Sequence, residues 1–341
     1  MSGALVDLVA IGIQDTFITG NPQISFFRSN YKRYVNFSIE PAQLDVIGQG
    51  AAGGEVKIVI PNKGDLLGSI WIDADVDDTS SSNINVGQVN PTEFSLYIGG
   101  KLIDRQDGFF TNTVWPLCLA STPTKALQPT TFFPLHFFNC DNNETPIPLV
   151  ALQYQTVDIQ VKYSSTSTPG NLKYYAEFIQ LDTDERKWFT SKDHDLLITQ
   201  MQKVPATATG CDLCYLNHPV KGLMWGTRPT STFDTTKAEI FLNGNSLFDM
   251  SLPSKFFTNV QRYYHCDNTI DHATGNEIFM YSFAERLNNS QPSGTCNFSR
   301  LDNAKINWTT SGTPDTPTSV YAVNYNILSI KKGLSGIKFS N

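Results

Sequence analysis

Short segments in which apolar and polar residues alternate recur along the whole chain. In the first half the alternating apolar positions are Val56, Ile58 and Ile60, then Phe94, Leu96 and Ile98, then Val157, Ile159 and Val161. In the second half the same spacing occurs at Ala238, Ile240 and Leu242, and at Tyr321, Val323 and Tyr325. A period of two is typical of β-strands with one buried face. The pattern therefore predicts an all-β protein built from many short strands.

The two halves also match each other at a nearly constant offset. Residues 96–100 match residues 240–244 with glycines 144 positions apart, residues 161–169 match residues 306–314 at an offset of 145, and Phe137 and Pro146 match Phe283 and Pro292 at 146. Separate matches at one offset indicate an internal duplication. We expect two copies of one domain of about 145–160 residues, an ordinary domain size.

Turn signals and longer connections narrow the fold class. Gly99-Gly100 and Asn243-Gly244 are strong signals for two-residue hairpin turns. Each hairpin is followed by an aromatic-rich stretch, residues 107–115 and 253–264, that we expect to be a helix packed on the sheet. The sequence predicts two tandem eight-stranded jelly-roll sandwiches, a double jelly roll, with short inserted helices. An immunoglobulin pair fits less well because each unit exceeds about 100 residues.

The predicted domain organisation has four parts. They are an N-terminal arm at residues 1–22, a first jelly roll at 23–183, a connector at 184–203 and a second jelly roll at 204–341. Thr190 and Asp193 resemble a capping box ahead of a short helix, so the connector should be structured rather than a flexible tether.

Composition excludes several classes of protein. The chain has 341 residues, a net charge of -7 and 17% charged residues. The negative charge argues against coating nucleic acid, and no direct nucleic-acid binding is expected. No run of 18 apolar residues exists that could form a membrane-spanning helix. The six cysteines carry no disulfide-framework signature, so reduced thiols are expected.

A search for catalytic or metal-binding residues identifies only weak candidates. Cys211 and Cys214 form a lone C-x-x-C pair without the second pair of a zinc finger. His265 and His272 lie near Asp267 and Asp271, but without the spacing of a known metal motif, so solvated loop residues are favoured. No nucleophile elbow, phosphate-binding loop or dinucleotide fingerprint occurs. We therefore predict no enzyme activity and no catalytic, cofactor-binding or metal-binding residues.

Two surface signals have alternative interpretations. Arg28, Lys32 and Arg33 alternate with aromatic residues, which could indicate nucleic-acid stacking, but a first strand with aromatics inward is favoured. Glycosylation sequons begin at Asn36, Asn143, Asn288, Asn297 and Asn307. The N-terminus lacks the features of a signal peptide, so we expect these asparagines to stay unmodified.

Longer runs carry a resemblance to a known family. They are residues 8–15, 19–27 and 31–37 near the N-terminus, 96–104, 148–154, 216–225 and 281–284 in the body, the run 291–304 (QPSGTCNFSRLDNA), and residues 325–339 at the end. Together they resemble the major capsid proteins of nucleocytoplasmic large DNA viruses over nearly the whole chain.

The resemblance implies a double jelly roll that acts as a structural major capsid protein. Homotrimers would form pseudo-hexagonal capsomers that tile an icosahedral virion shell around an internal membrane, with assembly in the host cell cytoplasm. The implied partners are the chain itself, neighbouring trimers and minor capsid proteins. The apolar arm could meet the minor capsid proteins or the internal membrane, or pack beneath its own sandwich. The stretch from Asp77 to Asn90 looks trimmed relative to the family, which implies a capsomer with a low top.

Two alternatives remain beside this interpretation. One is a capsid-related assembly scaffold, and the other is a specialised minor capsid paralogue. A carbohydrate-binding or enzymatic double jelly roll would need clustered histidines, carboxylates or exposed tryptophans, and the tryptophans are scattered.

Overall fold

The computed structural model describes residues 2–48, 52–74, 91–122, 125, 132–141, 144–165, 172–226, 235–267, 278–310 and 319–339. Contacts divide the chain into two units, Met1–Asn36 and Phe37–Asn341. The stretch from Asp77 to Asn90, which the sequence comparison suggested was trimmed, lies outside the described residues.

The first unit is an extended arm with two short helices. They are α1 (Gly3–Val9) and α2 (Thr16–Thr19). Every described residue of this arm is exposed, including Phe17, Phe26 and Phe27. The prediction of a strand around Arg28, Lys32 and Arg33 is wrong, because residues 26–36 are in no strand and their aromatic side chains are exposed.

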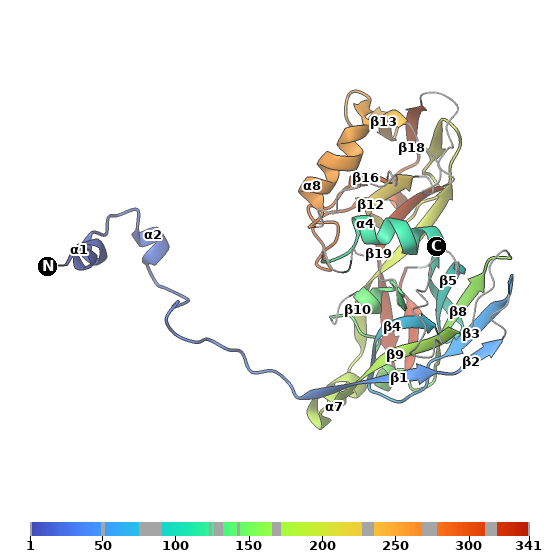
Figure 1. The fold of residues 1–341 in the computed structure, drawn as a ribbon, viewed down its shortest axis with the longest axis horizontal. Coiled ribbons are helices and arrows are strands. Elements are labelled where there is room, and N and C mark those ends of the chain that lie inside the picture. The colour runs from blue at the N-terminus through green and yellow to red at the C-terminus, as the bar shows by residue number, and fades with distance from the viewer. Residues whose placement is uncertain are drawn as a thin grey trace. The chain divides into compact units, whose positions relative to one another are not determined.

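The first sandwich of the second unit contains two antiparallel sheets (lower part of Figure 1). One has the order β1 (Phe37–Leu44), β9 (Leu172–Leu181), β4 (Leu66–Ala74), β7 (Phe132–Pro134). The other has the order β2 (Val46–Gly48), β3 (Glu55–Val59), β8 (Val157–Tyr163), β5 (Pro91–Ile98), β6 (Lys101–Asp107). The alternating apolar residues predicted for β3, β5 and β8 are buried between them, as expected.

The second sandwich repeats this arrangement. One sheet has the order β10 (His194–Pro205), β19 (Ser319–Lys331), β12 (Pro219–Gly226), β16 (Ile278–Ser282), with β17 (Cys296–Asn297) on β12 and β20 (Leu334–Ile337) on β19. The other has the order β11 (Gly210–Asp212), β18 (Ala304–Thr310), β13 (Thr235–Leu242), β14 (Asn245–Ser246), with β15 (Leu252–Pro253) on β13.

The strand pairings establish the duplication. β1-β9-β4-β7 corresponds to β10-β19-β12-β16, and β3-β8-β5-β6 corresponds to β11-β18-β13-β14. Irregularities recur too: β4 shifts register against β9 between Leu67 and Ile70, and β12 shifts against β19 between Val220 and Gly222. Four strands of each sheet correspond between the two copies, and this repeated two-sheet arrangement is the double jelly roll that the sequence predicted.

Both predicted hairpins and both predicted helices are present. The turn residues Gly99, Gly100, Asn243 and Gly244 all have positive φ, which glycine and asparagine tolerate best. The helical stretches contain π-helical turns, η1 (Phe110–Val114) and η3 (Phe256–Val260), and continue as α4 (Trp115–Cys118) and α8 (Gln261–His265). The other helices are α6 (Phe138–Asp141), η2 (Leu149–Ala151), α7 (Thr183–Ser191) and η4 (Phe298–Arg300).

The predicted connector is wrong in its second half. Thr190 lies in the last turn of the helix α7 instead of at its start, and the N-cap of α7 is Asp182, whose side chain accepts a hydrogen bond from the Thr183 N–H. From His194 onward the chain forms β10, which pairs with β19 along its whole length. Residues 194–203 therefore belong to the second sandwich. The other domain boundaries stay predictions.

Strand β19 departs from simple alternation. Val320 and Ala322 face the core of the second sandwich, whereas Tyr321 and Val323 lie in a separate apolar cluster. Further along, Leu328 and Ile330 join the core of the first sandwich. The prediction that Tyr321, Val323 and Tyr325 mark a strand is confirmed, but this strand is buried on both faces.

Candidate functional site at the junction of the two sandwiches

The inserted helical segment of the first sandwich covers the outer face of the second sandwich's sheet. Figure 1 shows α4 beside β12 and β19. The segment contributes Phe110, Val114, Trp115, Cys118 and Leu119, and the sheet contributes Met224, Ile278, Met280, Tyr321 and Val323, all buried. We call this contact the junction. Because burial of one large apolar side chain is worth about 1.5–3 kcal/mol, the junction holds the two sandwiches firmly together.

Asp107 connects the helical segment to both sandwiches. Its Oδ1 accepts a hydrogen bond from the Phe110 N–H at 2.8 Å, close to the start of η1. Its Oδ2 accepts from Tyr321 Oη at 2.8 Å and from Lys203 Nζ at 2.6 Å. One carboxylate therefore orders the start of the helical turn and bonds the neighbouring sheet.

Asp104, at the same edge, is a buried carboxylate that bridges β6 and β10. Its oxygens accept hydrogen bonds from the Met201 N–H at 2.9 Å, the Arg105 N–H at 2.9 Å and Gln106 Nε2 at 2.8 Å. Burial raises the pKa of Asp104 to about 6, although these donors act in the opposite direction. The carboxylate thus carries its charge at neutral pH at an energetic cost.

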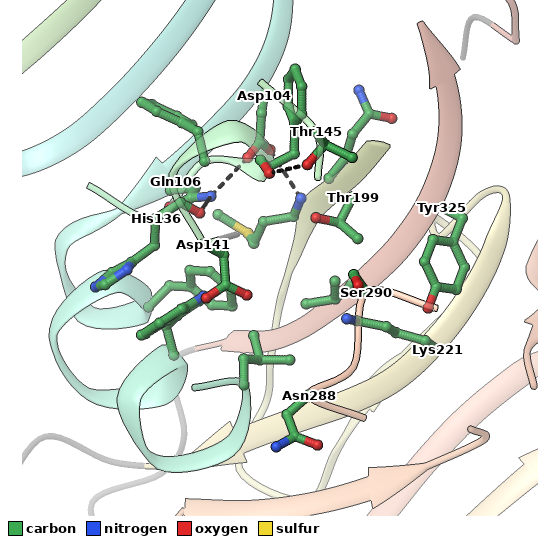
Figure 2. A pocket seen from close by; sticks show the side chains of 18 of the residues that line it. Asp104, Gln106, His136, Asp141, Thr145, Thr199, Lys221, Asn288, Ser290 and Tyr325 are labelled. Carbon is green, nitrogen blue, oxygen red and sulfur yellow. Dashed lines mark hydrogen bonds between the residues drawn. The ribbon is translucent and has the colours of Figure 1, made fainter. Parts of the chain in front are cut away.

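A small polar cavity lies beside these residues, with a volume of about 70 Å³ (Figure 2). Asp141 of the first sandwich and Lys221 of the second point toward it from opposite sides. Lys221 is only 6% exposed, and burial lowers the pKa of its amine to about 8. Tyr325 Oη and Asn288 Oδ1 are buried there without a hydrogen-bond partner among the described residues.

We interpret this cavity as part of the structural junction and not as a ligand-binding or catalytic site. Its volume is far below the roughly 300–1,000 Å³ of small-molecule sites and is enough for about two water molecules. His136, the histidine in its wall, stacks on Trp115 with ring centroids 3.6 Å apart. Burial lowers the pKa of His136 to about 3, so this ring stays neutral and is a poor proton donor.

The cysteine pair singled out from the sequence lies elsewhere, at the edge of the second sandwich. Cys211 Sγ is 3.4 Å from the Pro205 carbonyl oxygen, and burial raises the pKa of this thiol to about 12. A hydrogen bond with Asp212 raises the pKa of the Cys214 thiol. Zinc binds the thiolate, so both shifts disfavour coordination. No group of three or more potential metal ligands occurs among the described residues.

The other candidates also have structural partners. His265 Nδ1 lies 3.0 Å from the Glu285 carbonyl oxygen, and Asp267 forms an ion pair with Arg286 at 2.8 Å. His272, Asp271 and the sequon at Asn143 lie outside the described residues. Among the other sequons, Asn36, Asn297 and Asn307 are exposed, whereas Asn288 is only 3% exposed and donates to the Ala120 carbonyl oxygen at 3.3 Å.

Sequence reasoning missed the residues of the junction. Asp104 lies in the segment around the first hairpin that matches the second copy, but the residues of this segment do not show that its carboxylate is buried. Lys221 falls within the apolar strand β12. A charged residue at a position where the strand is expected to be buried is the signal that could have identified it.

Comparisons with known proteins agree with this architecture. A family profile described as the major capsid protein N-terminus matches residues 25–180, and one described as the large eukaryotic DNA virus major capsid protein matches residues 234–336. A major capsid protein of Pyramimonas orientalis virus is 32% identical, with all of both chains covered. The chain belongs to the major capsid protein family of large DNA viruses.

Further relatives support the family and the fold. The major capsid protein of Paramecium bursaria Chlorella virus 1 is 30% identical over the full length of both chains. A chain of the PBCV-1 virus capsid has a TM-score of 0.76 and 25% identity, covering 93% of this chain and all of that one. The Faustovirus major capsid protein shares the fold, with a TM-score of 0.67 and 11% identity.

Membership of this family defines the coarse function. The protein is a structural major capsid protein of the virion shell, and shells of this kind assemble from many copies of the chain. The relatives and the solved structures named above are all capsid proteins. Among the residues described, no helix has the length and apolar character needed to cross a bilayer.

Proposed function

We propose that three copies of the chain form a pseudo-hexagonal capsomer, and that these capsomers tile an icosahedral shell around an internal membrane. The observation that carries the proposal is the pair of sandwiches with one strand order, joined by a buried junction. Three such chains present six similar sandwiches, which can occupy six similar positions around one axis. Minor capsid proteins and neighbouring capsomers are the further partners, and assembly takes place in the host cell cytoplasm.

The mass of the purified protein tests the capsomer. Native mass spectrometry should give three times the chain mass, and negative-stain images should show hexagonal particles. A protein that remains monomeric at high concentration would refute the proposal. Abundance in mature particles separates a shell protein from an assembly scaffold or a rare minor paralogue, because only the shell protein is retained as the most abundant chain.

The arm is proposed to face the inside of the shell. The two helices and the segment between them expose Leu5, Leu8, Ile13, Phe17 and Ile18, a surface that is unfavourable in water unless something covers it. Deletion of residues 2–18 should leave the sandwiches folded but impair shell formation, as measured by particle yield. Normal shells formed by the variant that lacks residues 2–18 would refute a role of the arm in assembly.

A further inference from the structure

The last part of the arm combines exposed aromatic rings with basic side chains. We call residues 26–34 the basic-aromatic segment. Its aromatic residues Phe26, Phe27 and Tyr31 are 88%, 97% and 81% exposed. Its basic residues are Arg28, Lys32 and Arg33, all exposed. Because the segment forms no strand, its alternation of ring and charge needs an explanation other than the packing of a sheet.

The charges of the arm are segregated along the chain. Asp7 and Asp15 are the charged side chains that precede the basic-aromatic segment, and no acidic residue occurs between Asp15 and Glu40. None of the ion pairs found among the described residues involves a basic residue of this segment. The segment is therefore a local concentration of positive charge on a chain whose net charge is -7.

The part of the arm that precedes this segment is apolar. Leu5, Leu8 and Val9 share one face of α1, because residues three and four positions apart are neighbours on a helix, and Asp7 lies on the other face. In α2, Phe17 is 88% exposed. Neither helix has a buried residue. The arm thus presents an apolar surface followed by an aromatic and basic one.

This order of surfaces matches the layers of a lipid bilayer. Aliphatic side chains are stabilised among acyl chains, aromatic rings favour the boundary with the headgroups, and Arg and Lys attract anionic headgroups. Nucleic acid could contact the basic and aromatic residues, but it would leave the aliphatic residues of α1 and α2 in water. With seven and four residues, these helices are far shorter than the roughly 20 residues of a spanning helix. They fit a position in the plane of the bilayer surface.

We propose that the arm binds the surface of an anionic lipid bilayer. The apolar residues of α1 and α2 enter the outer part of the acyl chains, and the basic-aromatic segment contacts the headgroups. Charge complementarity selects anionic lipid, because this segment carries three basic residues and no acid. The inference rests on the proposed function, in which the arm faces the inside of a shell that encloses a membrane, and it names the lipid class and the residues that bind it.

The two surfaces of the arm should contribute in different ways. Each Arg or Lys near an anionic surface strengthens binding about fivefold, so the three basic residues together should contribute about 100-fold. This contribution should fall as the salt concentration rises, because salt screens exposed charges. The apolar contribution should not depend on the charge of the headgroups.

Flotation of the purified full-length protein with lipid vesicles tests the inference. Wild type should float with vesicles of phosphatidylcholine and phosphatidylserine, and much less with vesicles of phosphatidylcholine alone. The variant R28Q/K32Q/R33Q should bind the phosphatidylserine vesicles about 100-fold more weakly and bind phosphatidylcholine vesicles as wild type does. Its melting profile should be that of wild type, because every described residue of the arm is exposed.

A control variant separates the position of the charges from their number. K237Q/K255Q/R300Q removes the same total charge from exposed residues of the second sandwich, and it should float as wild type does. The variant L8S/F17S addresses the apolar surface, and it should weaken binding to both kinds of vesicle by a similar factor.

The outcomes separate the lipid contact from the other partners of an exposed arm. Wild type that does not float with phosphatidylserine vesicles would overturn the inference and leave the arm to a protein surface. Flotation that is unchanged in R28Q/K32Q/R33Q would also overturn it. Binding of a single-stranded oligonucleotide that is lost in R28Q/K32Q/R33Q, without vesicle binding, would assign the basic-aromatic segment to nucleic acid instead.

The native mass of the same samples separates this inference from the proposed function. A trimer that does not float would refute the lipid contact and leave the capsomer intact. A protein that floats as predicted but is not trimeric would refute the capsomer and support the lipid contact.

Discussion

The central strands β19 and β12 of the sheet β10-β19-β12-β16 are buried on both faces, whereas the equivalent strands β9 and β4 of the sheet β1-β9-β4-β7 are buried on one face and partly exposed on the other. The strand order and the position of the register shift are the same in both. The outer residues differ, because they are Met224 and Tyr321 in one sheet and Trp71 and Tyr175 in the other. The covering also differs, because the helical segment of the first copy packs on Met224 and Tyr321. One fold therefore supplies an internal junction at the outer face of one copy and leaves the equivalent face of the other copy partly exposed.

A charge on the two equivalent positions should have very different effects. Met224→Asp places a carboxylate at a fully buried site without a partner, so the free energy of unfolding should fall by more than about 4 kcal/mol. Trp71→Asp faces partly exposed surface and should cost the isolated chain about 1 kcal/mol. Urea denaturation of both variants under monomeric conditions measures the difference. Similar losses would show that the two outer faces are equally buried in the isolated chain.

Removal of the Asp107 carboxylate tests how far the junction depends on one polar residue. Asp107→Ala loses the bonds from Lys203, Tyr321 and the Phe110 N–H, which should lower the free energy of unfolding by about 2–4 kcal/mol. Asp195→Ala is the control, because its ion pair with Lys338 is at the surface and should contribute little. An Asp107→Ala variant as stable as the control would show that apolar contacts alone hold the junction.

Asp104 should make stability depend on pH. Its pKa is about 6 in the folded chain, above the ordinary aspartate pKa of about 3.9 when unfolded. The folded state therefore keeps the proton over this window, so the contribution of Asp104 is present below about pH 4 and is lost as the pH rises through about 6. The loss corresponds to about 3 kcal/mol for the two pH units between these values.

Asp104→Asn isolates this contribution. The variant cannot ionise, so the wild type should gain stability relative to it when the pH falls from 7 to 4.5, as measured by urea denaturation at each pH. Parallel curves for the two proteins would show that the pKa of Asp104 is close to its ordinary value.

Much of the sandwich could be predicted because its signals are local. Val157, Ile159 and Val161 alternate because one face of β8 meets the core, and the pairs Gly99-Gly100 and Asn243-Gly244 satisfy the backbone of two-residue turns. The duplication was visible because both copies preserve the hairpin and the following strand. These signals depend on a strand and its immediate neighbours alone.

The parts that could not be predicted depend on contacts between the copies. Alternation cannot show that Tyr321 and Val323 face another sandwich while Val320 and Ala322 face the core. Nor can it show that Asp104 and Lys221, charged residues in otherwise ordinary strands, become buried. The arm was assigned a strand from the alternation of aromatic and basic residues, but alternation alone supplies no strand to pair with.

The smallest expected effects concern the two equivalent hairpin turns, where the copies should behave alike. Gly100 and Gly244 have φ values of 77° and 82°, and an added Cβ would meet no atom within 4 Å at either position. The cost of alanine is therefore conformational, about 1 kcal/mol at each turn, with no steric contribution. Gly100→Ala and Gly244→Ala should lower the free energy of unfolding equally, and a large difference between them would show that the two turns are not equivalent. Neither turn takes part in the junction. If the two glycine variants lose equal stability while Met224→Asp and Trp71→Asp lose unequal stability, the two copies have diverged in the outer faces of their sheets.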